Sequence, residues 1–146
     1  MKSIGATNKR KGSNAERYYV NIFRDMGYEK CVTARYGSKI HDDAGIDLLN
    51  IPFNIQIKAG VQKGLKPVHT IMEVKDRIRR MFPEDNKEQS YPTILIHKKE
   101  VGRGKKRTEF DEIVIMTFLD FQKIINNKEV TNVIYWNKKT DSGIQR

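Results

Sequence analysis

The chain has 146 residues, with 28 Lys and Arg against 18 Asp and Glu, which gives a formal net charge of +10. This length favours a single domain with a real core, and no apolar run is long enough to cross a bilayer. The single cysteine, Cys31, excludes an internal disulfide and a metal held by a cluster of thiolates.

The basic balance predicts a polyanionic partner. Nucleic acid is favoured over an acidic membrane, because the basic residues do not line one amphipathic helix. The amino terminus is basic and polar with no apolar stretch behind it, unlike a secretory signal. We therefore expect a protein of the cytoplasm, or of a host cytoplasm if a virus encodes it, that is not secreted. Charge alone leaves ribosomal-type RNA binding open.

Three segments are expected along the chain: a basic flexible arm over 1–12, one folded domain over 13–137 and a polar tail over 138–146. A helix is predicted over 14–26, since apolar residues recur at helical spacing and a glycine follows at the stop position. Ser13 and Glu16 match a capping box, which is a structural interpretation of Glu16. Glu16 also lies at the margin of the apolar face, from which it could look toward a sheet.

Residues 28–36 are predicted to form a strand and residues 37–44 a loop. Two apolar runs follow, 46–51 and 53–59, which predict paired strands. Asp47 interrupts the first run. Strand alternation places Gln56 and Lys58 on one face of the second run. These two paired strands would bring the Asp47 carboxylate, the Gln56 carboxamide and the Lys58 ammonium together on one small sheet.

The rest of the chain predicts helices and strands in alternation. The expected elements are a helix over 68–81 ended by Pro83, strands over 93–97 and 113–118 covered on both faces, a basic turn over 98–107, a helix over 117–125 capped by Thr117 with Asp120, and an edge strand over 131–137. This order predicts the α/β class, with a mixed central β-sheet flanked by helices.

The polar residues in the two apolar runs, 46–51 and 53–59, suit metal-assisted phosphodiester cleavage. Hydrolysis needs an activated water and positive charge on the phosphate oxygens, and Mg²⁺ held by oxygen ligands supplies both. Asp47 is the expected principal ligand and Glu16 a second carboxylate, while the Ile57 carbonyl or the Gln56 side-chain oxygen could complete the site. Lys58 would orient the water and stabilise the developing charge. Each of these residues also has a purely structural interpretation, because an Asp followed by Gln-x-Lys occurs by chance in many proteins.

Four motifs follow one another over residues 11–60. They are Lys11-Gly12-x-x-x-Glu16-Arg17, Ala34-Arg35-x-x-Ser38, Asp47 and Gln56-x-Lys58. In this order they resemble the PD-(D/E)XK nuclease superfamily, and within it the archaeal and viral Holliday junction resolvases. The resemblance implies a restriction-endonuclease-like core and a nuclease-like domain over 13–137. It implies dependence on Mg²⁺, with Mn²⁺ able to substitute, and carboxylate ligands at Glu16 and Asp47 with a lysine at Lys58. It also implies a role for Ser38 near the scissile phosphate.

Two residues depart from the superfamily pattern. Gln56 stands where an acid is expected, and Ile46 stands where a proline precedes the aspartate. Glutamine removes one negative charge and should weaken Mg²⁺ binding. Gln-x-Lys resembles the version in Mrr-type restriction endonucleases, which favours a variant site over an inactive one.

The sequence thus predicts a Mg²⁺-dependent, structure-selective DNA endonuclease that acts as a homodimer and resolves Holliday junctions. A duplex endonuclease of restriction or repair type and a catalytically inactive nucleic-acid-binding protein remain alternatives. The residues expected to contact DNA phosphates are Lys9, Arg10, Lys11, Arg17, Arg35, Lys39, Lys63, Lys66, Arg103, Lys105 and Lys106. His41 is a further candidate for such a contact, and the three histidines are too dispersed to predict a zinc site.

Overall fold

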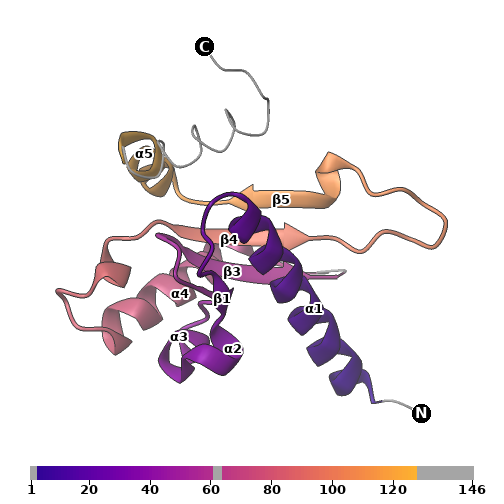
Figure 1. Ribbon diagram of the computed structural model, residues 1–146, viewed down its shortest axis with the longest axis horizontal. Coiled ribbons are helices and arrows are strands. Elements are labelled where there is room, and N and C mark those ends of the chain that lie inside the picture. The colour runs from indigo at the N-terminus through magenta and orange to yellow at the C-terminus, as the bar shows by residue number, and fades with distance from the viewer. Residues whose placement is uncertain (1–2, 61–63, 128–146) are drawn as a thin grey trace.

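The computed structural model describes residues 3–60 and 64–127, which build a small mixed sheet flanked by helices (Figure 1). In chain order the elements are α1 (Ile4–Asp25), β1 (Val32–Thr33), α2 (Ala34–Gly37), α3 (Lys39–Asp43), β2 (Leu48–Leu49), β3 (Asn54–Ala59), α4 (Pro67–Met81), the 3₁₀ helix η1 (Lys87–Gln89), β4 (Thr93–Lys98), the 3₁₀ helix η2 (Glu109–Asp111), β5 (Glu112–Ile115) and α5 (Phe118–Asn126). The predicted α/β class is confirmed. Lys63, the predicted edge strand 131–137 and the polar tail 138–146 lie outside the described residues.

The main sheet has the order β3-β4-β5, in which β3 and β4 are parallel and β4 and β5 antiparallel. β1 and β2 form a separate antiparallel pair. The prediction that residues 46–51 and 53–59 pair as neighbouring strands is therefore wrong. One backbone hydrogen bond between the two runs does exist: the Asp47 N–H donates to the Ile55 carbonyl over 2.7 Å. The ladder does not extend from there, since the chain leaves the sheet at Asn50, whose φ of 65° is left-handed, and passes through Pro52.

α1 begins far earlier than predicted, with Ser3 as its N-cap. Residues 4–12, expected to be a flexible arm, are helical and largely exposed. Apolar periodicity could not show this part of the helix, because it buries almost nothing. Ser13 consequently lies inside the helix, where its hydroxyl accepts a hydrogen bond from Arg17 over 3.2 Å. The predicted capping box is wrong, so Glu16 does not cap α1.

The predicted strand over 28–36 is also wrong for most of its length. Val32 and Thr33 alone pair with β2, and the chain then turns into α2 and α3. Ser38 caps α3, accepting a hydrogen bond from the His41 N–H, in the segment that was expected to be a loop. The Ala34 N–H donates to the Asp47 carbonyl over 2.8 Å. This bond fastens the start of α2 beside the residue predicted to be central.

The core consists of two apolar clusters. One joins Tyr19 and Val20 of α1 to Ile55 of β3 and Ile94 and Ile96 of β4, with Ile57 packed against it. The other joins Val74 and Ile78 of α4 to Ala44, Ile46 and Phe82. The apolar side of β3 therefore faces α1. As predicted, β4 is buried from Thr93 to His97, but β5 is not, since Ile113 and Val114 are 40% and 53% exposed.

The last two helices agree with the sequence expectations. α4 has Pro67 in its first turn and ends before Pro83. In α5 the Thr117 hydroxyl accepts a hydrogen bond from the Asp120 N–H over 3.1 Å, as the predicted cap requires. The fully buried Asp120 carboxylate pairs with Lys75 over 2.7 Å, which fastens α5 to α4. None of the described helices combines the length and apolar character needed to cross a membrane.

Candidate functional site

Asp47 lies immediately before β2, where the small β1–β2 pair meets β3. Its Oδ2 atom accepts a hydrogen bond of 2.7 Å from the Ile57 N–H. Its backbone accepts from Ala34 and donates to Ile55. The side chain and backbone of Asp47 are thus both fastened, and the carboxylate has a set position at the edge of β3.

Asp47 as a residue is half-buried, and protein atoms surround its carboxyl group. Burial raises the pKa of its carboxyl to about 7, against the opposing effect of the Ile57 hydrogen bond. The negative charge of Glu16 raises this pKa further, and the positive charge of Lys58 lowers it. Glu16 and Lys58 are therefore both close enough to act electrostatically on Asp47. Near neutral pH, Asp47 exchanges between a bound proton and a free carboxylate that can receive a cation.

Glu16 is bound by Arg35. The Arg35 Nη2 lies 2.9 Å from Glu16 Oε1, and Nε lies 3.2 Å from Oε2. The Glu16 side chain is only 7% exposed and that of Arg35 is 24% exposed. Such a fork-to-fork contact is the strongest kind of side-chain ion pair. Each carboxylate oxygen of Glu16 therefore already has a guanidinium partner.

Gln56 and Lys58 lie on the face of β3 opposite Ile55 and Ile57, as strand alternation predicts. The Gln56 amide lies beside Gly45: a Cβ atom at Gly45 would come within 3.3 Å of Gln56 Nε2. Gly45 also has a φ of +86°, which side chains disfavour, so the close approach of Gln56 depends on this glycine. Lys58 forms no ion pair within the part of the chain that the structure describes.

The oxygen donors around Asp47 fit a hard divalent cation in part. The N–H and C=O of a strand residue point to the same side, so the Ile57 carbonyl points to the edge at which Asp47 receives the Ile57 N–H. Of the four predicted ligands, Asp47 and Ile57 are thus together. Glu16 is available only when Arg35 leaves it, and Gln56 packs beside Gly45. No group of three or more His, Cys, Asp or Glu suited to a metal occurs within residues 3–60 and 64–127.

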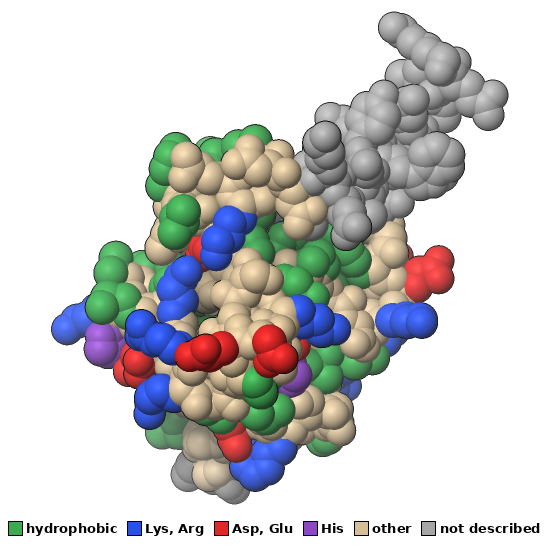
Figure 2. All heavy atoms as spheres, turned by 90° about the vertical axis from the view of Figure 1, so that its left-hand side faces the viewer, with side chains coloured by type: hydrophobic (Ala, Val, Ile, Leu, Met, Phe, Trp, Pro, Cys, Tyr) green, Lys and Arg blue, Asp and Glu red, His purple; other side chains and the backbone are tan. Residues whose placement is uncertain are grey.

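The predicted phosphate contacts fall into two groups. Lys9, Arg10 and Lys11 on α1, and Arg103, Lys105 and Lys106 on the β4–β5 connection, are exposed. The Lys11 ammonium lies 2.9 Å from Glu100, and α1 and the connection extend beyond the sheet at the same end (Figure 1). The remaining described members are Arg17 and Arg35 with the contacts given above, Lys39 paired with Asp43 at 2.7 Å, and Lys66 at the start of α4. On the face of the molecule that Figure 2 shows, which is the left-hand side of Figure 1, basic and acidic side chains are interspersed.

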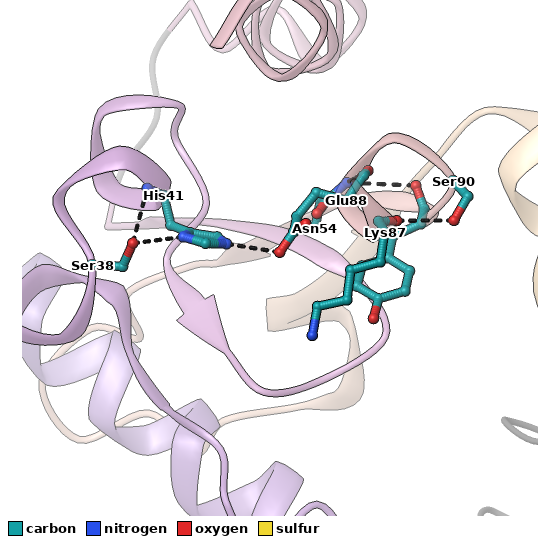
Figure 3. Close-up of polar contacts among 7 residues, drawn as sticks. Ser38, His41, Asn54, Lys87, Glu88 and Ser90 are labelled. Atoms are coloured by element: carbon teal, nitrogen blue, oxygen red, sulfur yellow. Dashed lines mark hydrogen bonds and ion pairs between the residues drawn. The ribbon is translucent and has the colours of Figure 1, made fainter. Parts of the chain in front are cut away.

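A chain of polar contacts from Ser38 to Glu88 was not predicted (Figure 3). The Ser38 Oγ lies 2.6 Å from His41 Nδ1, and His41 Nε2 lies 2.9 Å from Glu88 Oε1. The Asn54 amide donates to the Glu88 carbonyl over 2.8 Å. The contact between His41 and Glu88 thus fastens α3, which Ser38 caps, to η1. The only signal in the sequence is the three-residue spacing of Ser38 and His41, because Glu88 is 47 positions away.

Removing the His41 ring should destabilise the fold. The Glu88 side chain is 9% exposed, and its buried Oε2 has no hydrogen-bond partner among the residues that the structure describes. His41→Ala would leave this carboxylate without its ring donor, so we expect the free energy of unfolding to fall by ~3 kcal/mol. Urea denaturation followed by circular dichroism measures the change. Adding Glu88→Gln should recover part of the loss, because a neutral amide costs less to bury, and an unchanged midpoint in His41→Ala would contradict the prediction.

Comparisons of the chain with protein-family models, with curated proteins and with solved structures find no match. The residues described above therefore carry the evidence on function.

Proposed function

We propose that this protein is a Mg²⁺-dependent DNA endonuclease with a restriction-endonuclease-like core, and that it resolves Holliday junctions. The observation that carries the proposal is the position of Asp47. Its carboxylate is fastened by the Ile57 N–H, and its pKa responds to the charges of Glu16 and Lys58. This combination of a carboxylate, a second acid and a lysine is suited to metal-assisted hydrolysis of a phosphodiester. The resemblance of residues 11–60 to the PD-(D/E)XK nucleases supports the same reaction.

The reaction assigns a task to each residue. Asp47 and the Ile57 carbonyl would hold the cation, and Glu16 would join them once free of Arg35. A bound Mg²⁺ would supply positive charge at the phosphate and lower the pKa of a water. Lys58 would keep an ammonium beside the scissile phosphate, where negative charge develops on the oxygens. The Ser38 hydroxyl would contact the same phosphate, and the basic residues of α1 and of the β4–β5 connection would bind the flanking backbone.

Junction resolution needs two symmetric cuts, so we propose that the active species is a homodimer. Exposed apolar side chains on β5 and α5 support an association of this kind; they are Ile113, Val114, Phe118, Leu119, Phe121 and Ile125. Figure 2 shows hydrophobic side chains at the surface over α5. Light scattering on the protein alone and with a junction tests this, and a monomer in both states would contradict it. We place the protein in the cytoplasm, or in a host cytoplasm, where its DNA substrate is accessible.

The test of the function is cleavage of a labelled four-way junction beside a linear duplex of the same sequence, in Mg²⁺, Mn²⁺ or EDTA. Paired symmetric nicks in the junction alone, lost in EDTA, are expected. Cutting of both substrates would instead establish the duplex endonuclease of restriction or repair type. Tight binding without cutting in any cation would overturn the enzymatic proposal.

One observation favours the second candidate, a nucleic-acid-binding protein without catalytic activity. Arg35 contacts both oxygens of Glu16, and Gln56 replaces an acid, so the site has fewer free carboxylate oxygens than the resemblance implies. Such a protein would bind DNA through its basic surface alone. It predicts binding that is weakened by salt and unaffected by removal of divalent cations.

The raised pKa of Asp47 predicts a pH dependence of cation binding. In metal-free protein, the NMR chemical shift of the Asp47 carboxyl carbon should change with pH, with a midpoint at about 7. A cation binds the ionised form, so Mn²⁺ affinity should rise by ~10-fold per pH unit below this midpoint and level off above it. Isothermal titration calorimetry across the range measures the slope. Asp47→Asn should remove the dependence, and a wild-type affinity that is flat from acid to neutral pH would disprove it.

A further inference from the structure

The Glu16–Arg35 ion pair occupies atoms that the proposed reaction needs. Arg35 contacts both carboxylate oxygens of Glu16 at 2.9 and 3.2 Å. The hydrogen bonds that Arg35 donates to Glu16 raise the pKa of Arg35, so the guanidinium stays charged. A divalent cation and a guanidinium compete for the same carboxylate oxygens. In the free protein, therefore, Glu16 is not available to a cation at Asp47.

The Arg35 guanidinium can also bind a phosphate group. A phosphate presents paired oxygens that a guanidinium fork binds as it binds a carboxylate. The Arg35 side chain is 24% exposed, so a phosphate can reach it, whereas the Glu16 carboxylate behind it is 7% exposed. Arg35 lies on α2, whose first residue, Ala34, is hydrogen-bonded to the Asp47 backbone. A phosphate bound to Arg35 is therefore held close to Asp47.

We propose that Arg35 couples DNA binding to cation binding: a DNA phosphate takes the guanidinium from Glu16, and the released carboxylate joins Asp47 around the cation. This inference rests on the proposed function. Loss of the guanidinium leaves Glu16 and Asp47 as neighbouring acids without their shared counter-ion, which favours a dication between them. Asp42 and Asp47 also attract Arg35, so the guanidinium neutralises a group of acids until substrate arrives.

No other basic residue of the described chain makes such a contact with a proposed ligand. Lys11 and Lys39 pair with Glu100 and Asp43, which belong to no proposed site. Arg17 follows Glu16 directly in α1, but its guanidinium bonds to the Ser13 hydroxyl. Arg17 therefore offers a control in which the same charge is removed next to Glu16 without freeing its carboxylate.

The first experiment measures Mn²⁺ binding to the protein without DNA, by electron paramagnetic resonance of the free ion. Arg35→Gln should bind Mn²⁺ at least ~10-fold more tightly than wild type, because it removes a positive charge that competes with the cation for the Glu16 oxygens. Arg17→Gln should change the affinity by much less. Equal affinities in the two variants would overturn the proposal, because general charge removal would then explain the result.

A second pair of variants tests the exchange from the DNA side, in EDTA, and serves if Arg35→Gln fails to fold. Glu16→Gln frees Arg35 for phosphate, so it should bind a labelled four-way junction several-fold more tightly than Asp42→Asn, which removes the same charge from an exposed acid. Equal binding by the two would overturn the proposal. Neither experiment uses cleavage, so an inactive protein would defeat the proposed function and leave the exchange to be judged on these affinities.

Discussion

Asp47→Asn should lower the rate of junction cleavage by ~10³-fold or more, a loss of ~4 kcal/mol of transition-state stabilisation. Asparagine keeps the size of the side chain, and its oxygen can still accept the hydrogen bond from the Ile57 N–H. What it loses is the negative charge that would hold the cation. Single-turnover cleavage at saturating protein measures the rate, and binding to the junction in EDTA should persist.

Asp42→Asn is the matched control for this change. Asp42 lies on α3, is exposed, and affects the pKa of Asp47, yet it has no assigned role in the reaction. Its replacement removes the same charge close by and should leave the cleavage rate within a few-fold of wild type. If Asp47→Asn folds, binds DNA and cleaves at the wild-type rate, Asp47 holds no catalytic cation.

The second large effect is expected from Lys58. Lys58→Met keeps most of the side-chain length and removes the ammonium, which should slow cleavage by ~10²–10³-fold, as loss of one group that stabilises transition-state charge does. Mn²⁺ binding should be unchanged or tighter, because a positive charge near the cation is gone. This separation of rate from cation affinity distinguishes a group that acts on the phosphate from one that supports the metal site.

Lys30→Met provides the comparison, since Lys30 is exposed and lies in none of the proposed contacts. It should leave cleavage unchanged. A wild-type rate in Lys58→Met would remove Lys58 from the reaction. Loss of Mn²⁺ binding together with cleavage would show that Lys58 supports the fold around Asp47, which thermal unfolding of the variant would reveal.

Much of the fold could be predicted where neighbouring residues determine it. The apolar period of α4, its proline start and the proline after its end lie within one stretch of chain, as do the Thr117–Asp120 cap and the buried run of β4. The same local pattern failed at the first helix, where residues 4–12 bury almost nothing and so show no period. It also failed at β2 and β3, since both runs read as strands but neither shows its partner.

The candidate site divides in the same way. The sequence by itself determined the residue types, namely Glu16, Asp47, Gln56 and Lys58 in an order that resembles a nuclease, and the net positive charge of the chain. Only the tertiary structure decided which contacts they make. It pairs Glu16 with Arg35, turns Gln56 toward Gly45, and joins Ser38 through His41 to Glu88. The physical reason is that spacing along a helix or strand is set by local geometry, whereas these contacts depend on how α1, α2, α3 and η1 pack around β3.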